Sequence, residues 1–254
     1  MAISRNQPPV LSIVIPAHNE AKSLPETLTT LSHTLTTHHI SHEILVVNDH
    51  SSDSTELVVL GLKNNIPEIE LISNNSQRGF GHTIITGLNA FKGQYVAIFM
   101  ADQSDDPSDL VKFYNTAIET GVDAVFGSRF VKGGRVVKYP LLKLWINRCA
   151  NNLVRLLFHV SYNDCTNAFK LYKRETIDGL RPFLAGHFNL TLELPLKVIV
   201  RGYSYRVLPN SWYNRKHGRS NLKNKEMGGR YLFIMLYCLI ERYFSKGDFK
   251  KMMR

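Results

Sequence analysis

The chain has 254 residues, of which 44% are hydrophobic and 20% charged. This size and composition predict one globular α/β domain with a sizeable core and exclude a disordered chain. The net charge is +10, and residues 197–254 alone carry 14 Lys and Arg against 3 Asp and Glu. Such segregation indicates contact with phosphate groups, whether on a lipid, a nucleic acid or a substrate.

The first half of the chain alternates short apolar runs with helical patterns. Strands are predicted over residues 11–15, 42–49, 69–73, 95–100 and 123–127. Helices are predicted over about 23–35, 55–63 and 79–90, and from Pro107 onward. This alternation is typical of right-handed crossovers and a mostly parallel sheet with helices on both faces.

The second half is less regular. Residues 141–158 and 189–200 have helical spacing, and YSYRVLP (203–209) reads as a strand. YLFIMLYCLI (231–240) is apolar on every side, between Arg230 and Glu241–Arg242. It is too short to span a bilayer, which needs roughly 20 apolar residues. The segment alone is typical of a buried helix, whereas the basic residues around it favour a helix in the membrane interface.

The expected compartment is the cytoplasm. The three cysteines form no CxxC pair, so neither a zinc knuckle nor a disulfide framework is indicated. No apolar segment of signal-peptide length precedes the first strand. We therefore expect a cytoplasmic protein that can still contact a membrane surface.

Polar residues follow three of the predicted strands. In open α/β sheets, ligands bind at the carboxyl ends of the strands. Asp102 emerges directly from a buried strand, and a carboxylate there suits Mg²⁺ or Mn²⁺ beside substrate phosphates. Asp105 and Asp106 have two interpretations, as metal ligands or as caps of the helix that starts near Pro107. The polar residues at the three strand ends are His18, Asn19, Glu20, Asn48, Asp49 and Asp102.

Several motifs together resemble one enzyme family. They occur in the order seen in family-2 glycosyltransferases of the GT-A fold, and most closely resemble its dolichyl-phosphate mannose synthase, or polyprenyl-phosphate glycosyltransferase, branch. The resemblance spans roughly residues 11–222. The motifs are PAHNE (16–20), VVNDHSSDST (46–55), RGFGHTIITGLNAFKG (78–93), MADQS (100–104), GSRF (127–130), DCTNAFKLYKR (164–174) and RKHGRSNL (215–222).

The resemblance implies that the first half binds a nucleotide sugar. It places Pro16, His18 and Glu20 in a loop that contacts the nucleotide. Asp49 matches an acid that holds the base or ribose, although the family's preceding acid is Asn48 here.

The resemblance also assigns a cation site with one ligand changed. Asp102 matches the last acid of the D-x-D metal motif, and Met100 stands where its first acid belongs. Three alternatives follow: Asp102, the diphosphate and waters suffice for Mg²⁺ or Mn²⁺, Asp105 substitutes for the missing acid, or metal binding is weak.

Phosphate contacts are implied for two arginines. Arg129 of GSRF, and Arg215 with Ser220 of the last motif, match positions that serve the donor diphosphate and acceptor phosphate. We expect both arginines to serve phosphates rather than the fold. Asp164 matches an acid near the acceptor, and a turn-forming aspartate is the alternative.

The expected reaction is inverting transfer of a hexose, mannose or glucose, from a nucleotide sugar to a polyprenyl or dolichyl monophosphate. The alternatives are a family-2 transferase with a soluble or protein-linked acceptor, and a non-catalytic nucleotide-sugar-binding protein. Nucleic-acid binding has no aromatic-interleaved basic motif to support it. The expected catalytic domain covers residues 1–228, and residues 229–254 form an apolar helix and basic tail. That tail would place Lys246, Lys250, Lys251 and Arg254 on lipid phosphates of a peripheral membrane site.

Overall fold

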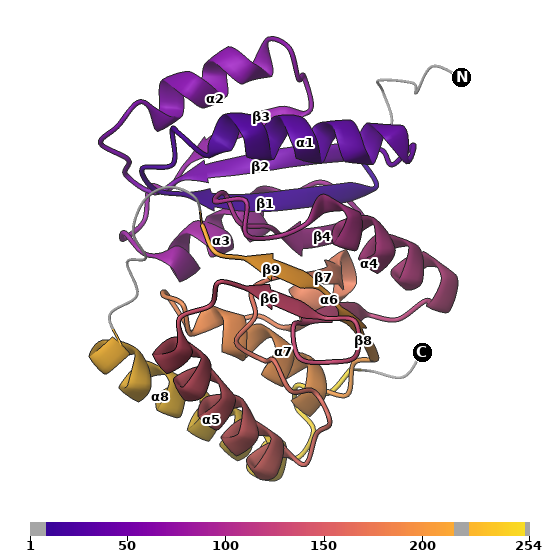
Figure 1. The fold of residues 1–254 in the computed structure, drawn as a ribbon. Helices are drawn as coiled ribbons and strands as arrows, with labels where there is room; N and C mark the ends of the chain where they lie inside the picture. The colour runs from indigo at the N-terminus through magenta and orange to yellow at the C-terminus, as the bar shows by residue number, and fades with distance from the viewer. Residues whose placement is uncertain (1–8, 216–223, 252–254) are drawn as a thin grey trace.

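The computed structural model describes residues 9–215 and 224–251. Its core is a seven-stranded sheet of order β3-β2-β1-β4-β7-β5-β8 (Figure 1). The strands are β1 (Leu11–Ala17), β2 (His42–Asn48), β3 (Ile69–Ser73), β4 (Tyr95–Ile98), β5 (Ala124–Ser128), β7 (Lys170–Lys173) and β8 (Tyr205–Pro209). A separate two-stranded sheet pairs β6 (Arg135–Val137) with β9 (Ser211–Tyr213).

The expected mostly parallel sheet is confirmed. β1 runs parallel to β2 and β4, with Leu11 opposite His42 and Tyr95. The short strand β7 was not predicted, and it runs antiparallel between β4 and β5. The first strand is longer than the predicted 11–15, since β1 continues through Pro16 to Ala17.

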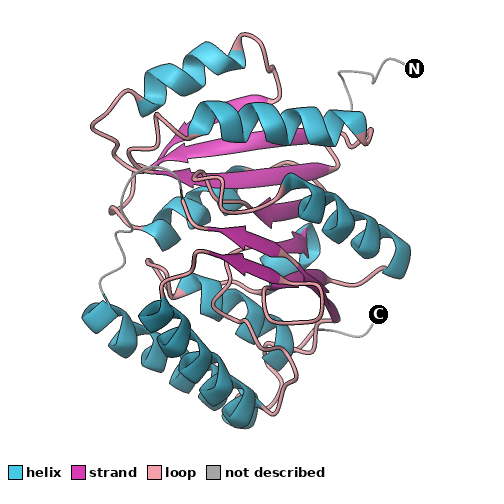
Figure 2. Ribbon diagram, viewed as in Figure 1, coloured by secondary structure: helices cyan, strands magenta, loops and turns pink. Residues whose placement is uncertain are grey.

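Helices cover both faces of the sheet (Figure 2). One face is packed by α1 (Leu24–Thr37), α2 (Thr55–Lys63) and α4 (Pro107–Thr120). The other is packed by α3 (Phe80–Ala90), α5 (Leu141–Phe158), α6 (Arg174–Gly179), α7 (Leu190–Val200) and α8 (Asn224–Phe244). Each face of the sheet thereby shares an apolar core with the helices that cover it.

The C-terminal helix is longer than the predicted segment and belongs to the core. Ile234, Met235 and Cys238 are buried, and α8 packs against α7. Buried Arg201 forms an ion pair with Glu241, with Nε 2.6 Å from Oε1. The domain boundary expected between residues 228 and 229 therefore falls inside α8.

One lysine of the basic tail forms an ion pair within the protein. Lys251 Nζ lies 2.8 Å from Asp123 Oδ2. Lys251 was expected to contact lipid phosphates, whereas here its ammonium contacts a carboxylate of the same chain. Arg254 lies outside the described residues. Within residues 9–215 and 224–251, no helix combines the length and apolarity needed to cross a bilayer.

Candidate active site

The loops after β1 and β2 meet through His18 and Asp49. His18 Nδ1 donates to the backbone carbonyl of Asp49 at 2.7 Å, which leaves Nε2 as an acceptor facing the Arg78 guanidinium. The Asp49 carboxylate accepts from Asn74 Nδ2 at 2.8 Å and from the Gly79 amide at 3.1 Å. The structure thus brings together the two loops to which the sequence assigned nucleotide contacts, and it adds the glycine-containing segment at the start of α3.

Glycines allow this third segment to approach a distant loop. A Cβ at Gly79 would lie 2.6 Å from the Gly186 carbonyl oxygen, and one at Gly81 2.5 Å from that of Ala185. Only glycine permits such close backbone packing. The N-terminus of α3 is therefore fixed against the loop that precedes α7.

Asp102, Glu20 and Arg215 converge near the ends of β1 and β4. Arg215 Nη2 lies 2.6 Å from Asp102 Oδ2, and Nη1 lies 3.7 Å from Glu20 Oε1. Asp102 Oδ1 also accepts from the Ser104 amide at 3.2 Å. Burial raises the pKa of Glu20, against the opposing effects of a hydrogen bond and of Arg215.

Two further site residues were expected from the sequence. Pro16 lies within β1, just before the loop that carries Glu20. Ser220 lies outside the described residues.

Asp105 and Asp106 have different roles. Asp106 caps α4, since its carboxylate accepts from the Ser108 amide at 2.9 Å. Asp105 is buried and accepts from the Met100 amide at 3.0 Å. Burial raises the pKa of Asp105 to about 7, and the nearby Asp102 charge adds to this.

We predict that the buried Asp105 carboxyl makes stability depend on pH. Because its pKa is raised to about 7, the folded protein holds this proton more tightly than the unfolded chain does. Its contribution is present below the unfolded value of about 4 and is lost as pH rises through 7. Asp105→Asn should therefore gain stability relative to wild type at pH 8 but not at pH 4, measured by urea denaturation. An equal effect at both pH values would contradict this.

Arg129 is buried and paired with Asp164. Arg129 Nη2 lies 2.7 Å from Asp164 Oδ1, and Arg129 Nε donates to Oδ2 at 2.8 Å. The Asp164 side chain is fully buried. This pair favours a structural role for Arg129, which the sequence did not predict, because an unpaired charge at this depth is strongly unfavourable. Arg129 lines the cavity described next, and Asp164 is not among the residues that line it.

A cavity of about 700 Å³ adjoins Asp102 and Arg215. Residues of α3, α5, α7 and α8 contribute to its walls, which are mostly apolar. The rings of Phe80 and Phe188 stack with centroids 4.1 Å apart. The apolar and aromatic side chains that line it include Phe80, Met100, Ile146, Leu153, Phe188, Tyr231 and Met235.

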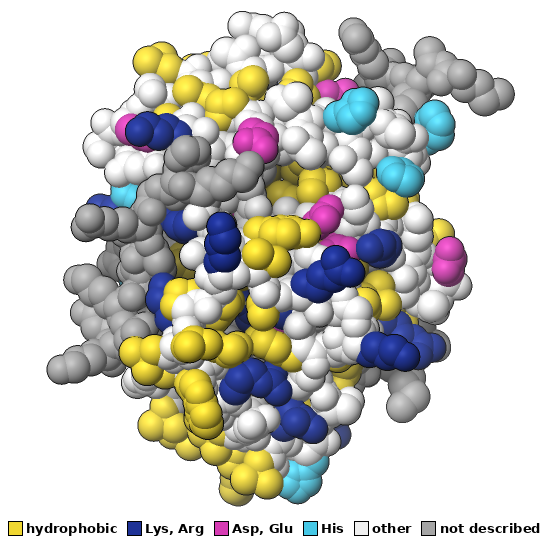
Figure 3. Space-filling model, in the orientation of Figure 1, with side chains coloured by type: hydrophobic (Ala, Val, Ile, Leu, Met, Phe, Trp, Pro, Cys, Tyr) yellow, Lys and Arg dark blue, Asp and Glu magenta, His cyan; other side chains and the backbone are white. Residues whose placement is uncertain are grey.

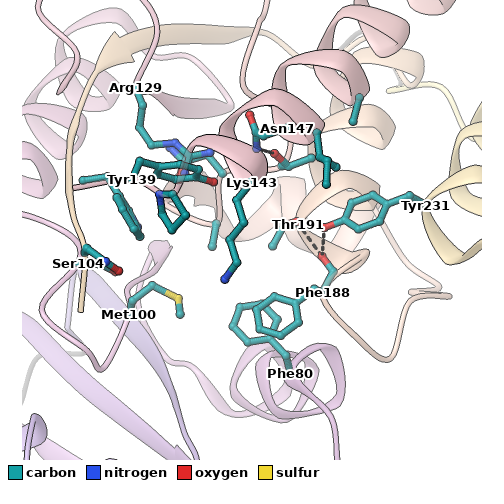
Figure 4. Close-up of a pocket in the computed structure, with 18 of the residues that line it drawn as sticks. Phe80, Met100, Ser104, Arg129, Tyr139, Lys143, Asn147, Phe188, Thr191 and Tyr231 are labelled. Atoms are coloured by element: carbon teal, nitrogen blue, oxygen red, sulfur yellow. Dashed lines mark hydrogen bonds between the residues drawn. The ribbon is translucent and has the colours of Figure 1, made fainter. Parts of the chain in front are cut away.

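Lys143 extends from α5 into this cavity, and its ammonium points toward the space between Met100 and Phe80 (Figure 4). Sequence reasoning missed Lys143. The sequence held one indication of a polar site here. Lys143 and Asn147 are one turn apart, and therefore on one face, of a helix whose other residues are largely apolar. An ammonium in an apolar cavity favours an anionic ligand.

The carboxylates here fit a divalent cation only with help from a ligand. Among the described residues, no group of three or more His, Cys, Asp or Glu side chains is arranged to hold a metal. Asp102 and Asp105 both line the cavity, however, and their carboxylates repel each other. A cation between substrate phosphates and these oxygens would relieve that repulsion, and Mg²⁺ commonly keeps waters as its other ligands.

Comparison with known proteins identifies the family. The model of glycosyl transferase family 2 matches residues 12–181. The chain belongs to glycosyl transferase family 2. It is a glycosyltransferase with the GT-A fold, as the motifs predicted.

Two curated relatives cover most of the chain. A polyprenol monophosphomannose synthase of Mycolicibacterium smegmatis is 28% identical, over 85% of this chain and 82% of that protein. A dolichol-phosphate mannosyltransferase of Pyrococcus furiosus is 27% identical over 85% of this chain. The match covers 60% of the Pyrococcus protein's length.

Solved structures share the fold. A glucosyl-3-phosphoglycerate synthase from Mycobacterium tuberculosis, in complex with Mn²⁺, UDP and phosphoglyceric acid, has a TM-score of 0.67 and 19% identity. The match covers 92% of this chain and 78% of that one. The same synthase with Mg²⁺ and UDP has a TM-score of 0.66 and 18% identity, over 92% of this chain and 79% of that one.

Proposed function

We propose that this glycosyltransferase moves a hexose, mannose or glucose, from a nucleotide sugar to a polyprenyl monophosphate with inversion at the anomeric carbon. The observation that carries the proposal is the apolar cavity beside Asp102, with Lys143 inside it. Apolar walls suit an isoprenoid chain, and the ammonium suits its phosphate. The names of the curated relatives support mannose and a polyprenol acceptor.

The reaction needs little proton transfer. An acceptor phosphate oxygen forms a bond to the anomeric carbon, while the bond from that carbon to the donor diphosphate breaks and the nucleoside diphosphate leaves. A phosphate monoester is largely ionised at neutral pH, so the nucleophile needs no strong base. The chain must instead bring two anionic groups together and hold them in line.

The residues divide this task. His18, Glu20 and Asp49 would position the nucleotide, Arg215 would neutralise the donor diphosphate, and Lys143 would bind the acceptor phosphate. Asp102 and Asp105 would hold Mg²⁺ or Mn²⁺, which when bound stabilises negative charge on the leaving diphosphate. Arg129, held by Asp164, would support the wall of the cavity.

Product analysis tests the proposal. The protein is incubated with GDP-mannose or UDP-glucose and with a short-chain polyprenyl phosphate, phosphoglycerate or no acceptor, and the products are identified by mass. A glycosylated polyprenyl phosphate is expected. Glycosylation of phosphoglycerate alone would favour a soluble acceptor, and neither transfer nor donor hydrolysis would favour a non-catalytic binding protein.

Lys143→Gln should raise the KM for the acceptor about tenfold or more, because a charge-assisted hydrogen bond contributes about 1.5–3 kcal/mol. Donor binding, measured by calorimetry with the nucleoside diphosphate, should be unchanged. The matched control is Lys132→Gln, since Lys132 is exposed. An unchanged acceptor KM in Lys143→Gln would rule out the assigned role.

The acceptor's chemistry also implies a membrane partner. We infer that the protein acts as a peripheral protein at the cytoplasmic face of a membrane that contains its lipid substrate. The excess of Lys and Arg in residues 197–254, 14 against 3 Asp and Glu, supports this inference.

A further inference from the structure

Helix α5 exposes large apolar side chains to solvent, although it also buries the apolar side chains of Val154 and Phe158. Asn151 is fully buried, and its Oδ1 accepts from the Cys165 amide at 2.6 Å. In contrast, Leu142, Trp145 and Leu156 are each 71% exposed. An ordinary surface helix turns its apolar stripe to the core, whereas α5 carries large apolar side chains on its solvent side as well.

The outward side of α8 continues this apolar surface. Phe244 is 75% exposed, and Phe233, Ile240 and Tyr243 are also exposed. Arg242 Nη1 donates to the Phe158 carbonyl at the end of α5 at 2.6 Å, which joins the two helices. Contiguous apolar patches are uncommon on soluble monomers and mark interaction surfaces.

The charges beside this surface are largely positive. In the space-filling view, Lys and Arg side chains lie next to the apolar patch in the lower part of the molecule (Figure 3). Helix α5 carries no acidic residue. Within residues 228–251 the acids are Glu241, which is buried against Arg201, and Asp248. Apolar residues with a basic surround complement an anionic lipid surface.

The cavity lies between the same two helices. Ile146 and Leu153 of α5, and Tyr231 and Met235 of α8, line it. We propose that the outward faces of α5 and α8 dock on an anionic bilayer, and that the lipid-phosphate acceptor passes from the bilayer into the cavity between them. This inference rests on the proposed function and adds α5 as the docking element.

Tryptophan fluorescence tests the docking directly, because Trp145 and Trp212 are the only tryptophans in the chain. The intact protein is mixed with phosphatidylcholine vesicles that contain phosphatidylglycerol and a brominated lipid quencher. Trp145 should be quenched, and the quenching should be lost in Trp145→Phe, which retains Trp212. Binding without quenching of Trp145 would mean that another face contacts the bilayer and would overturn the proposal.

A matched set of leucine substitutions tests the energetic role of α5. Leu142→Ser with Leu156→Ser should weaken vesicle partitioning by about tenfold or more. Leu57→Ser is the control, because Leu57 on α2 is 72% exposed and lies far from α5 in the fold (Figure 1). Equal partitioning of all variants would overturn the proposal.

Two further measurements separate the possible outcomes. A dimer that dissociates in the leucine variant, detected by light scattering in the absence of lipid, would assign the surface to a second copy of the chain and overturn lipid docking. Turnover of a short-chain acceptor should be the same in wild type and the leucine variant, and turnover of a long-chain acceptor in vesicles should fall. Vesicle binding with no transfer to either acceptor would instead contradict the proposed function.

Discussion

Asp102→Asn should lower turnover by about a hundredfold or more, since it removes a charge that faces both Arg215 and the site expected for the cation. The substitution keeps an oxygen for the Ser104 amide, so the local turn should persist. Initial rates at saturating donor and acceptor check the expectation, and Mn²⁺ binding in the presence of nucleoside diphosphate should weaken in parallel.

Asp106→Asn provides the control, because asparagine caps helices about as well as aspartate. This variant should keep its activity. Full activity of Asp102→Asn, or of the wild type in excess chelator, would contradict the assigned role of Asp102 in cation binding.

Arg129→Ala should destabilise the protein by about 3–5 kcal/mol, because it leaves the fully buried Asp164 carboxylate without its partner. Urea denaturation measures this change. Replacing both partners, as in Arg129→Met with Asp164→Leu, should recover much of the loss, because no buried charge of this pair then remains.

Arg206→Ala provides the comparison for an exposed arginine in strand β8, and it should change stability little. A small loss in Arg129→Ala, together with a large loss of activity per folded molecule, would return Arg129 to the phosphate-binding role that the sequence motif implies.

The sequence predicted the strands that have strong apolar patterns, and their order implied the parallel sheet. It missed β7, whose four residues, KLYK, carry lysines at both ends. Lys170 is buried in that strand, where its ammonium donates to backbone carbonyls of Cys165 and Thr191. Such contacts depend on tertiary structure, and a short charged segment otherwise resembles a loop.

The sequence predicted that the polar residues after the strands lie near one another, as His18 and Asp49 do. The pairing of Arg129 with Asp164 joins residues 35 positions apart and could not be deduced from either motif. Helical spacing predicted α5, but spacing alone does not show which face of a helix is covered. The position of Lys143 in the cavity and the exposed apolar surface of α5 and α8 were visible only in the fold.

The attachment of α8 has a consequence for shortened chains. The Arg201 guanidinium meets Glu241 across the core, and Tyr231 and Met235 form part of the cavity wall. A chain that stops before α8 would leave the Arg201 guanidinium without its carboxylate partner and would remove one side of the cavity. Loss of this helix would therefore appear as misfolding and degradation, and not as a folded enzyme that merely fails to bind lipid.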